Sequence, residues 1–208
     1  MKLENNSALL VIDTQNKYND INIISNKVKR NLKKILNRFN KENIPIFFTQ
    51  YQSCKTKNNC TRKKGHMISK IKSLKNNKWL SKKKPKWINE VEIYERKKTY
   101  KCPSYKCDII DELKEYSSIK NTFISNNMDS LMNKGLLKEI RKKNIKNLYI
   151  VGGWGGHCIV SSALSCINRC NIMPYVIEDA VFSPKKDNKI IFDMMNTIIP
   201  GYRTKDIV

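Results

Sequence analysis

The chain has 208 residues, a length that fits one domain with a full-sized hydrophobic core. Hydrophobic residues make up 40% of it, yet no apolar run is long enough to span a membrane and the first residues carry no secretory signal, so we expect an intracellular, cytoplasmic protein with no membrane partner. The seven cysteines are an odd number and several fall in expected helices, which favours reduced thiols over a disulfide framework.

The formal net charge is +23, and the excess of Lys and Arg is concentrated between Lys55 and Lys106. A basic stretch with interspersed aromatic residues can indicate a nucleic-acid site. The whole chain is nevertheless rich in Asn, Lys and Ile, which indicates compositional drift and makes a nucleic-acid partner the less favoured interpretation. Poor periodicity and low apolar density predict that residues 53–106 form a lysine-rich surface insertion in one domain, 1–208.

Apolar runs and helical periodicities alternate along the rest of the chain. This alternation predicts an α/β fold: a single doubly wound, three-layer domain with a mainly parallel sheet, which binds ligands at the carboxyl ends of its strands. In chain order, we predict a strand at 8–15, a helix at 24–39, a strand at 44–49, a helical turn at 109–113, a strand at 117–120, a helix at 131–143, a strand at 148–151, a helix at 158–170, a strand at 173–178 and a helix at 186–196.

The sequence GGWGGHC at 152–158 is the most informative motif, because it directly follows the predicted strand 148–151. Glycines adopt backbone dihedrals closed to other residues and let the backbone approach a ligand closely. Cys158 falls where the next helix should begin, and a helix N-terminus favours both an ionised thiol and a developing oxyanion. Cys158 is therefore a candidate nucleophile, although this segment alone favours a packed thiol in a tight turn.

Two other residues are predicted to lie beside Cys158. Asp13 and Lys120 each close a predicted strand, and neighbouring parallel strands would bring all three side chains to one edge of the sheet. The carboxylate could accept the thiol proton, the thiolate could attack an electrophilic carbon, and the ammonium group could support the moving charge. Asp13 could instead cap the following helix, and Lys120 is one of many lysines.

Four motifs at these places occur together and in order. They are Asp13-Thr14-Gln15, Lys120-Asn121-Thr122-Phe123, GGWGGHCIVSSA at 152–163, and Val176-Ile177-Glu178-Asp179-Ala180. In this combination the chain resembles the isochorismatase-like cysteine hydrolase superfamily, which includes nicotinamidases, N-carbamoylsarcosine amidohydrolases and ureidoacrylate hydrolases. The resemblance covers about residues 7–52 and 107–200.

The resemblance implies a role for each member of the trio: Asp13 as general base, Lys120 as triad lysine and Cys158 as nucleophile. It also implies a cis peptide bond between Gly153 and Trp154, beside an oxyanion hole built from the backbone of Gly153, Trp154 and Cys158. A small-molecule substrate and a homo-oligomer, a dimer or tetramer, are further implications. The candidate substrate-binding residues are Gln15, Phe123, Trp154 and His157, although His157 could equally serve packing or the start of the helix.

The residues after the second strand bear on cofactors. Nicotinamidases carry an Asp-x-His metal pair there, whereas this chain reads Gln50-Tyr51-Gln52, so we expect no catalytic metal and no cofactor. Another departure follows the lysine motif. Members of the superfamily often have Ser-Ala-Phe there, whereas this chain has Ile124-Ser125-Asn126. A structural zinc site remains an alternative use of the cysteines, with Cys54, Cys60, Cys102 and Cys107 as ligands and His66 as a possible substitute.

The function favoured by these residues is hydrolysis of a C–N bond. Superfamily members that act on isochorismate lack the cysteine, so Cys158 favours a cysteine hydrolase acting on a small amide, ureido or carbamoyl compound. Two alternatives stay open: a nicotinamidase, and a non-catalytic protein that kept the fold and binds anionic partners through its basic insertion.

Overall fold

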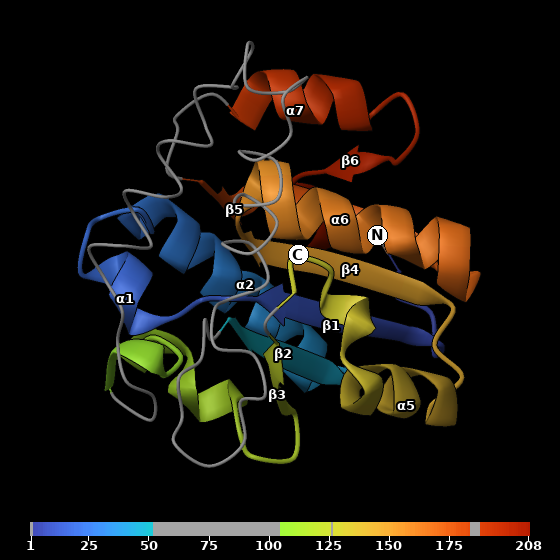
Figure 1. Cartoon of the computed structure of the whole chain (residues 1–208), viewed down its shortest axis with the longest axis horizontal. Coiled ribbons are helices and arrows are strands. Elements are labelled where there is room, and N and C mark those ends of the chain that lie inside the picture. The colour runs from blue at the N-terminus through green and yellow to red at the C-terminus, as the bar shows by residue number, and fades with distance from the viewer. Residues whose placement is uncertain (1, 52–104, 126, 184–187) are drawn as a thin grey trace, which may run out of the picture.

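The computed structural model describes residues 2–51, 105–125, 127–183 and 188–208 (Figure 1). Nearly all of the predicted basic insertion, 53–106, lies outside these residues. In the ranges described, no helix combines the length and the apolar character needed to cross a bilayer.

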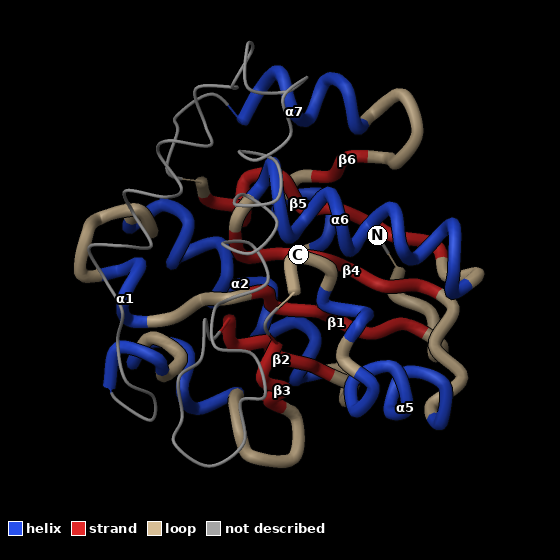
Figure 2. The backbone as a smooth tube through the Cα atoms, in the orientation of Figure 1, coloured by secondary structure: helices blue, strands red, loops and turns tan. Residues whose placement is uncertain are grey.

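One sheet of parallel strands forms the middle of the molecule, in the order β3-β2-β1-β4-β5-β6 (Figure 2). The chain proceeds from β1 to β2 and β3 on one side, and then returns to add β4, β5 and β6 on the other. The direction of winding therefore reverses between β1 and β4, and the predicted doubly wound α/β fold is confirmed. The strands are β1 Ser7–Ile12, β2 Ile46–Tyr51, β3 Thr122–Ser125, β4 Asn147–Gly153, β5 Met173–Phe182 and β6 Gly201–Tyr202.

Helices cover both faces of the sheet and complete three layers (Figure 1). Residues of α5, α6 and α7 pack on one face, and those of α2, η3 and α8 on the other. The helices are α1 Asn16–Asn19, α2 Asn26–Lys41, α5 Lys134–Lys142, α6 Val160–Ser165, α7 Asn188–Met195 and α8 Thr204–Ile207. The shorter turns are η2 Tyr105–Cys107, η3 Asp111–Tyr116, η4 Ser130–Met132, and the π-helical turns η5 Gly155–Ile159 and η6 Cys166–Cys170, which extend α6 at both ends.

The central strand β1 is buried on both faces, as its continuous apolar sequence predicts. Leu10 and Ile12 belong to the core on the α5–α6 side, whereas Leu9 and Val11 belong to the core on the α2 side. Side chains on a strand alternate between faces, so this packing fixes the register of β1. It also fixes the position of the residue that follows the strand, Asp13.

The strand predicted at 117–120 is wrong. These residues form a loop and turn, and β3 begins only at Thr122. The reason is the Asn121 side chain, which accepts a 2.6 Å hydrogen bond from the Ser118 backbone N–H and donates one of 2.9 Å to the Tyr116 carbonyl. Local bonds of this kind stabilise a turn in competition with a strand ladder.

The last part of the chain extends beyond the predicted elements. β5 continues to Phe182, past the predicted end at residue 178, through an irregularity in its pairing with β4. The last predicted helix corresponds to α7 and is followed by β6 and α8, both too short to give a periodic pattern. The predicted helix 131–143 is divided into η4 and α5, since Asn133 caps α5 by accepting a hydrogen bond from the Leu136 N–H.

One cysteine departs from the expected redox state. Cys107 is disulfide-bonded, whereas Cys158, Cys166 and Cys170 are free thiols. The expectation of reduced cysteines is therefore wrong for Cys107, because cysteine spacing alone does not define pairing. The other candidate zinc ligands, Cys54, Cys60, Cys102 and His66, lie outside the described residues.

Candidate active site

Asp13 and Cys158 come together where the winding of the sheet reverses. Asp13 directly follows β1, and Cys158 lies in η5, just after the adjacent strand β4. The two strands pair up to their ends, with Ile12 opposite Gly152. Crevices outside the carboxyl ends of strands at such a reversal are the usual ligand sites of doubly wound sheets.

Two glycines allow the chain to turn tightly from β4 into η5. Gly152 has a φ of +104°, and a Cβ atom there would lie 2.1 Å from the carbonyl oxygen of Ile12. A Cβ at Gly153 would lie 2.3 Å from the ring of Phe182. The peptide bond between Gly153 and Trp154 is cis, as predicted. Only glycine fits these two positions, and the turn they form places Cys158 beside the end of β1.

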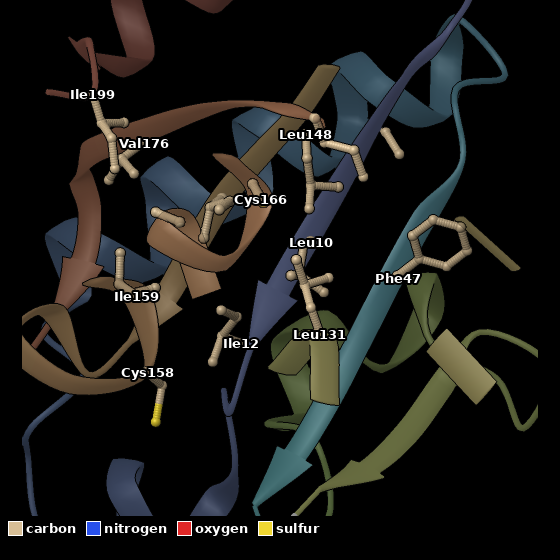
Figure 3. Close-up of a cluster of buried hydrophobic side chains, with 14 of the residues drawn as sticks. Leu10, Ile12, Phe47, Leu131, Leu148, Cys158, Ile159, Cys166, Val176 and Ile199 are labelled. Atoms are coloured by element: carbon tan, nitrogen blue, oxygen red, sulfur yellow. The ribbon is translucent and has the colours of Figure 1, made fainter. Parts of the chain in front are cut away.

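The Cys158 side chain lies at the edge of the core and retains a small exposed fraction of 9%. Figure 3 shows its sulfur turned away from the other labelled core side chains. The thiol lies beside the carboxyl of Asp13, so that each group acts on the ionisation of the other. The backbone of Trp154 also acts on the sulfur and lowers the pKa of the thiol.

Asp13 is held by β2 as well as by its own strand. Its backbone N–H donates a 3.1 Å hydrogen bond to the Thr49 carbonyl, and the Thr49 hydroxyl donates one of 2.9 Å to Oδ1 of the carboxyl group. Its φ of +53° lies in the left-handed region, which aspartate tolerates better than most residues. The carboxyl is 4% exposed and is therefore fixed in direction.

Burial perturbs the ionisation of both groups. It raises the pKa of Asp13 to about 6, against the opposing effects of the Lys17 charge and of hydrogen bonds from Thr49, Cys158 and Tyr51. Burial, followed by the nearby Asp13 charge, raises the pKa of Cys158 well above its ordinary value. Near neutral pH the pair therefore holds one proton, which lies on the sulfur, and the carboxylate is free to accept it.

The structure does not bring Lys120 beside Asp13 and Cys158. Lys120 is exposed and lies in the turn before β3, at the amino end of that strand, whereas Asp13 and Cys158 lie at the carboxyl ends of theirs. At about 3.3 Å per residue, β3 alone separates the two ends by roughly 10 Å. A strand at 117–120, as predicted, would have ended at Lys120. The residue at the carboxyl end of β3 is Ser125, which pairs with Tyr51.

Two of the predicted substrate-binding residues, Gln15 and Phe123, contact other parts of the protein. Gln15 is fully buried; its amide donates a 2.7 Å hydrogen bond to the Cys107 carbonyl and accepts one of 2.9 Å from the Tyr51 N–H. Phe123 packs against the core and lies 6.1 Å from the ring of Phe47. We therefore assign both residues to the framework of the site.

Trp154 and His157 remain beside the candidate nucleophile. Their rings are 5.8 Å apart in an edge-to-face arrangement, and the Trp154 ring lies 5.7 Å from that of Tyr18. Both side chains are partly exposed, and burial lowers the pKa of His157, which keeps it neutral near pH 7. They are the aromatic groups available to a ligand near Cys158.

Sequence reasoning did not identify two residues that act on the pair. Thr49 lies inside β2 as an ordinary strand residue, and its only signal is a polar side chain in a buried run. Lys17 lies four residues after Asp13, on α1, and its charge acts on both Asp13 and Cys158. In the part of the chain that is described, no three side chains of His, Cys, Asp or Glu are grouped as metal ligands would be.

The chain also matches a known protein family by sequence. The family model of the isochorismatase domain matches residues 7–199, which is most of the chain. The chain belongs to the isochorismatase family. The predicted superfamily is thereby confirmed, and with it the prediction of a hydrolase-type enzyme. A search among curated proteins finds no match.

Solved structures from the same family share the fold. The N-carbamoylsarcosine amidase from Thermoplasma acidophilum has a TM-score of 0.66 at 15% identity, over 95% of this chain and 96% of that one. A cysteine hydrolase from Pseudomonas syringae has a TM-score of 0.70 at 9% identity, over 100% and 93%. The YcaC gene product of Escherichia coli, an octameric hydrolase of unknown specificity, has a TM-score of 0.66 at 16% identity, over 100% and 80%.

Proposed function

We propose that this isochorismatase-family protein hydrolyses a C–N bond in a small amide, ureido or carbamoyl compound, with Cys158 as nucleophile and Asp13 as general base. The observation that carries the proposal is the juxtaposition of the two buried side chains at the reversal point of the sheet, where each acts on the ionisation of the other. Family membership and the similarity to an N-carbamoylsarcosine amidase support the substrate class.

The first half of the reaction forms a covalent intermediate. Asp13 takes the proton of the Cys158 thiol while the sulfur attacks the carbonyl carbon, and the carbonyl electrons move to oxygen. Backbone N–H groups of the turn at Gly153, Trp154 and Cys158 would hold the oxyanion. When the oxyanion collapses, the C–N bond breaks and the proton on Asp13 passes to the departing nitrogen, which leaves an acylated or carbamoylated sulfur.

The second half restores the enzyme with one water molecule. Asp13, again a carboxylate, accepts a proton from water as its oxygen attacks the thioester-type carbon. The C–S bond then breaks, and the sulfur regains its proton from Asp13. The products are an amine or ammonia and a carboxylic or carbamic acid, so atoms and charges balance. Trp154 and His157 would contact the substrate beside the sulfur.

Turnover of a substrate panel tests this mechanism. Wild type and Cys158→Ala are assayed for ammonia release from nicotinamide, ureidoacrylate-like and carbamoyl compounds. We expect at least one compound to be hydrolysed by wild type and the rate to fall by roughly 10³-fold or more in Cys158→Ala, because the residual rate would come from binding alone. Cys170→Ala removes a free, half-buried thiol from the same helical segment and should keep full activity.

Two results would overturn the proposal. Substantial turnover by Cys158→Ala would remove the nucleophile. No turnover of any compound, combined with a Cys158 that iodoacetamide leaves unmodified while salt-sensitive nucleic-acid binding is observed, would favour the non-catalytic binding protein. Preferential turnover of nicotinamide would instead identify the nicotinamidase alternative within the same chemistry.

A further inference from the structure

We propose that Ser183, the residue directly after β5, is a positioning residue for the turn that leads from β4 to Cys158. Its hydroxyl group accepts a 2.9 Å hydrogen bond from the backbone N–H of Gly155, inside that turn. The inference rests on the proposed function, because it concerns the backbone groups that would hold the oxyanion. Ser183 acts through this backbone and is assigned no contact with the substrate.

The first support is the irregular pairing of β5 with β4, which brings Ser183 to the turn. After the irregularity Phe182 lies opposite Gly153, whereas an unbroken register would place Asp179 there. The extra residues in β5 change which side chains reach the end of the strand, as β-bulges beside active sites do. As a result, Ser183 leaves the sheet beside Gly155, the first residue of η5.

The second support is the anchoring of the residue before Ser183. Phe182 is buried in the core on the α2 side, with its ring 6.1 Å from that of Tyr18. The same ring lies so close to Gly153 that a Cβ atom there would be 2.3 Å from it. Ser183 therefore follows a fixed point of the chain, and its hydroxyl group is held in place beside the turn.

The third support is that the peptide group between Trp154 and Gly155 is held at both ends. Its N–H is bonded to Ser183, and its carbonyl oxygen accepts hydrogen bonds of 3.1 Å and 3.2 Å from the N–H groups of His157 and Ile159. Because a peptide group is planar, bonds at both ends fix its orientation. The backbone of Trp154 acts on the nucleophile's sulfur and belongs to the proposed oxyanion donors, so Ser183 helps to aim it.

The glycine content of the turn explains why an anchor from another strand is needed. The turn has four glycines at 152, 153, 155 and 156, and glycine has more backbone freedom to lose than any other residue. Oxyanion donors stabilise a developing charge only when they are aimed at it in advance, and a displacement of about 1 Å can cost roughly 100-fold in rate. A hydroxyl group that holds Gly155 limits this freedom.

Two reactions of Cys158 that differ in their need for oxyanion donors test the role of Ser183. Iodoacetamide alkylates the sulfur by displacing iodide from a saturated carbon, and no oxyanion forms. Propionaldehyde instead adds reversibly: the sulfur bonds to the carbonyl carbon, the carbonyl electrons move to oxygen, and that oxygen receives the thiol proton by way of Asp13. Protection of Cys158 against iodoacetamide measures the dissociation constant of this adduct.

Ser183→Ala should separate the two reactions. We expect the dissociation constant of propionaldehyde to rise roughly tenfold, and kcat for a hydrolysed substrate to fall by a similar factor with KM within about twofold, while the rate of alkylation stays unchanged. Ser183→Thr keeps the hydroxyl group and should restore the wild-type values. Ser25→Ala is the matched control: the Ser25 hydroxyl also accepts a backbone N–H, that of Val28 at the start of α2, and its loss should change neither reaction.

Three results would overturn the inference: equal aldehyde affinity in wild type and Ser183→Ala, an equal loss of alkylation and aldehyde binding, or a loss in Ser183→Thr as large as in Ser183→Ala. Failure of the hydrolase proposal looks different, because wild-type Cys158 would then bind no aldehyde and hydrolyse no substrate.

Amide hydrogen exchange gives a reading on wild type that does not depend on how well a variant folds. The Gly155 N–H should exchange slowly, because Ser183 accepts its hydrogen bond. Exchange at Gly155 as fast as in an unfolded peptide would contradict the role of Ser183.

Discussion

The hydroxyl of Thr49 donates a 2.9 Å hydrogen bond to carboxyl oxygen Oδ1 of Asp13, from the strand beside the one that Asp13 follows. This bond lowers the pKa of Asp13 against the effect of burial. We predict that Thr49→Val, which removes the donor and nearly conserves shape, raises the pKa of Asp13 above about 6. The acid side of the kcat/KM profile should move upward in pH, with a several-fold lower rate at pH 6. Thr49→Ser keeps the hydroxyl and should keep the profile.

Asp13 should make the folded protein less stable as pH rises. Its pKa is raised in the folded state from 3.8 to about 6, so the folded state holds the proton more tightly than the unfolded one. The favourable contribution is complete below pH 3.8 and is lost as pH rises through about 6. The shift of about two units corresponds to roughly 3 kcal/mol.

Asp13→Asn removes this titration and isolates its effect. The free energy of unfolding of the variant minus that of wild type should increase by up to about 3 kcal/mol between pH 4 and pH 8. Urea denaturation of both proteins across this range measures the difference. The variant should also be inactive, because an amide cannot accept the thiol proton. A difference in stability that does not vary with pH would show that the carboxyl is not perturbed.

Gly152 should tolerate no side chain. A Cβ there would meet the Ile12 backbone, and its φ of +104° is unfavourable to other residues. We predict that Gly152→Ala destabilises the protein by about 3 kcal/mol or more. Gly135→Ala is the matched control, since a Cβ there would meet side chains only, with the Asn133 Oδ1 nearest at 3.3 Å, and a shift of a few tenths of an ångström accommodates it. Thermal unfolding of both variants checks the contrast; equal melting temperatures would contradict it.

Gln15 should contribute to stability rather than to substrate affinity. Gln15→Leu would remove the hydrogen bonds that Gln15 makes with the Cys107 carbonyl and the Tyr51 N–H, each of which contributes about 0.5–1.5 kcal/mol. We expect a clear loss in the free energy of unfolding and a displaced Tyr51. If Gln15 instead contacted the substrate, KM would rise with little change in unfolding, and the two measurements together decide between these roles.

The sequence predicted the fold and the neighbouring positions of Asp13 and Cys158, because each had a strong local signal. The apolar run of β1 placed Asp13, and the glycine motif placed Cys158. The position of Lys120 could not be predicted in this way. A turn closed by the Asn121 side chain was taken for a strand, so Lys120 lies at the amino end of β3 rather than at the carboxyl end of a strand.

The contribution of Thr49 depends on a pairing between distant parts of the chain. A single threonine in an apolar strand carries no information about its partner, and a cysteine spacing likewise does not define a disulfide. The contact between Thr49 and Asp13 forms only when β1 and β2 lie side by side.

The left-handed backbone at Asp13 has a consequence for how this position can vary. At a φ of +53°, aspartate, asparagine and glycine are accommodated, whereas branched side chains such as valine or isoleucine add roughly 1–2 kcal/mol of strain. A library randomised at this codon and selected only for solubility in cells should therefore return these three amino acids. The same library selected for growth on the substrate should return aspartate alone.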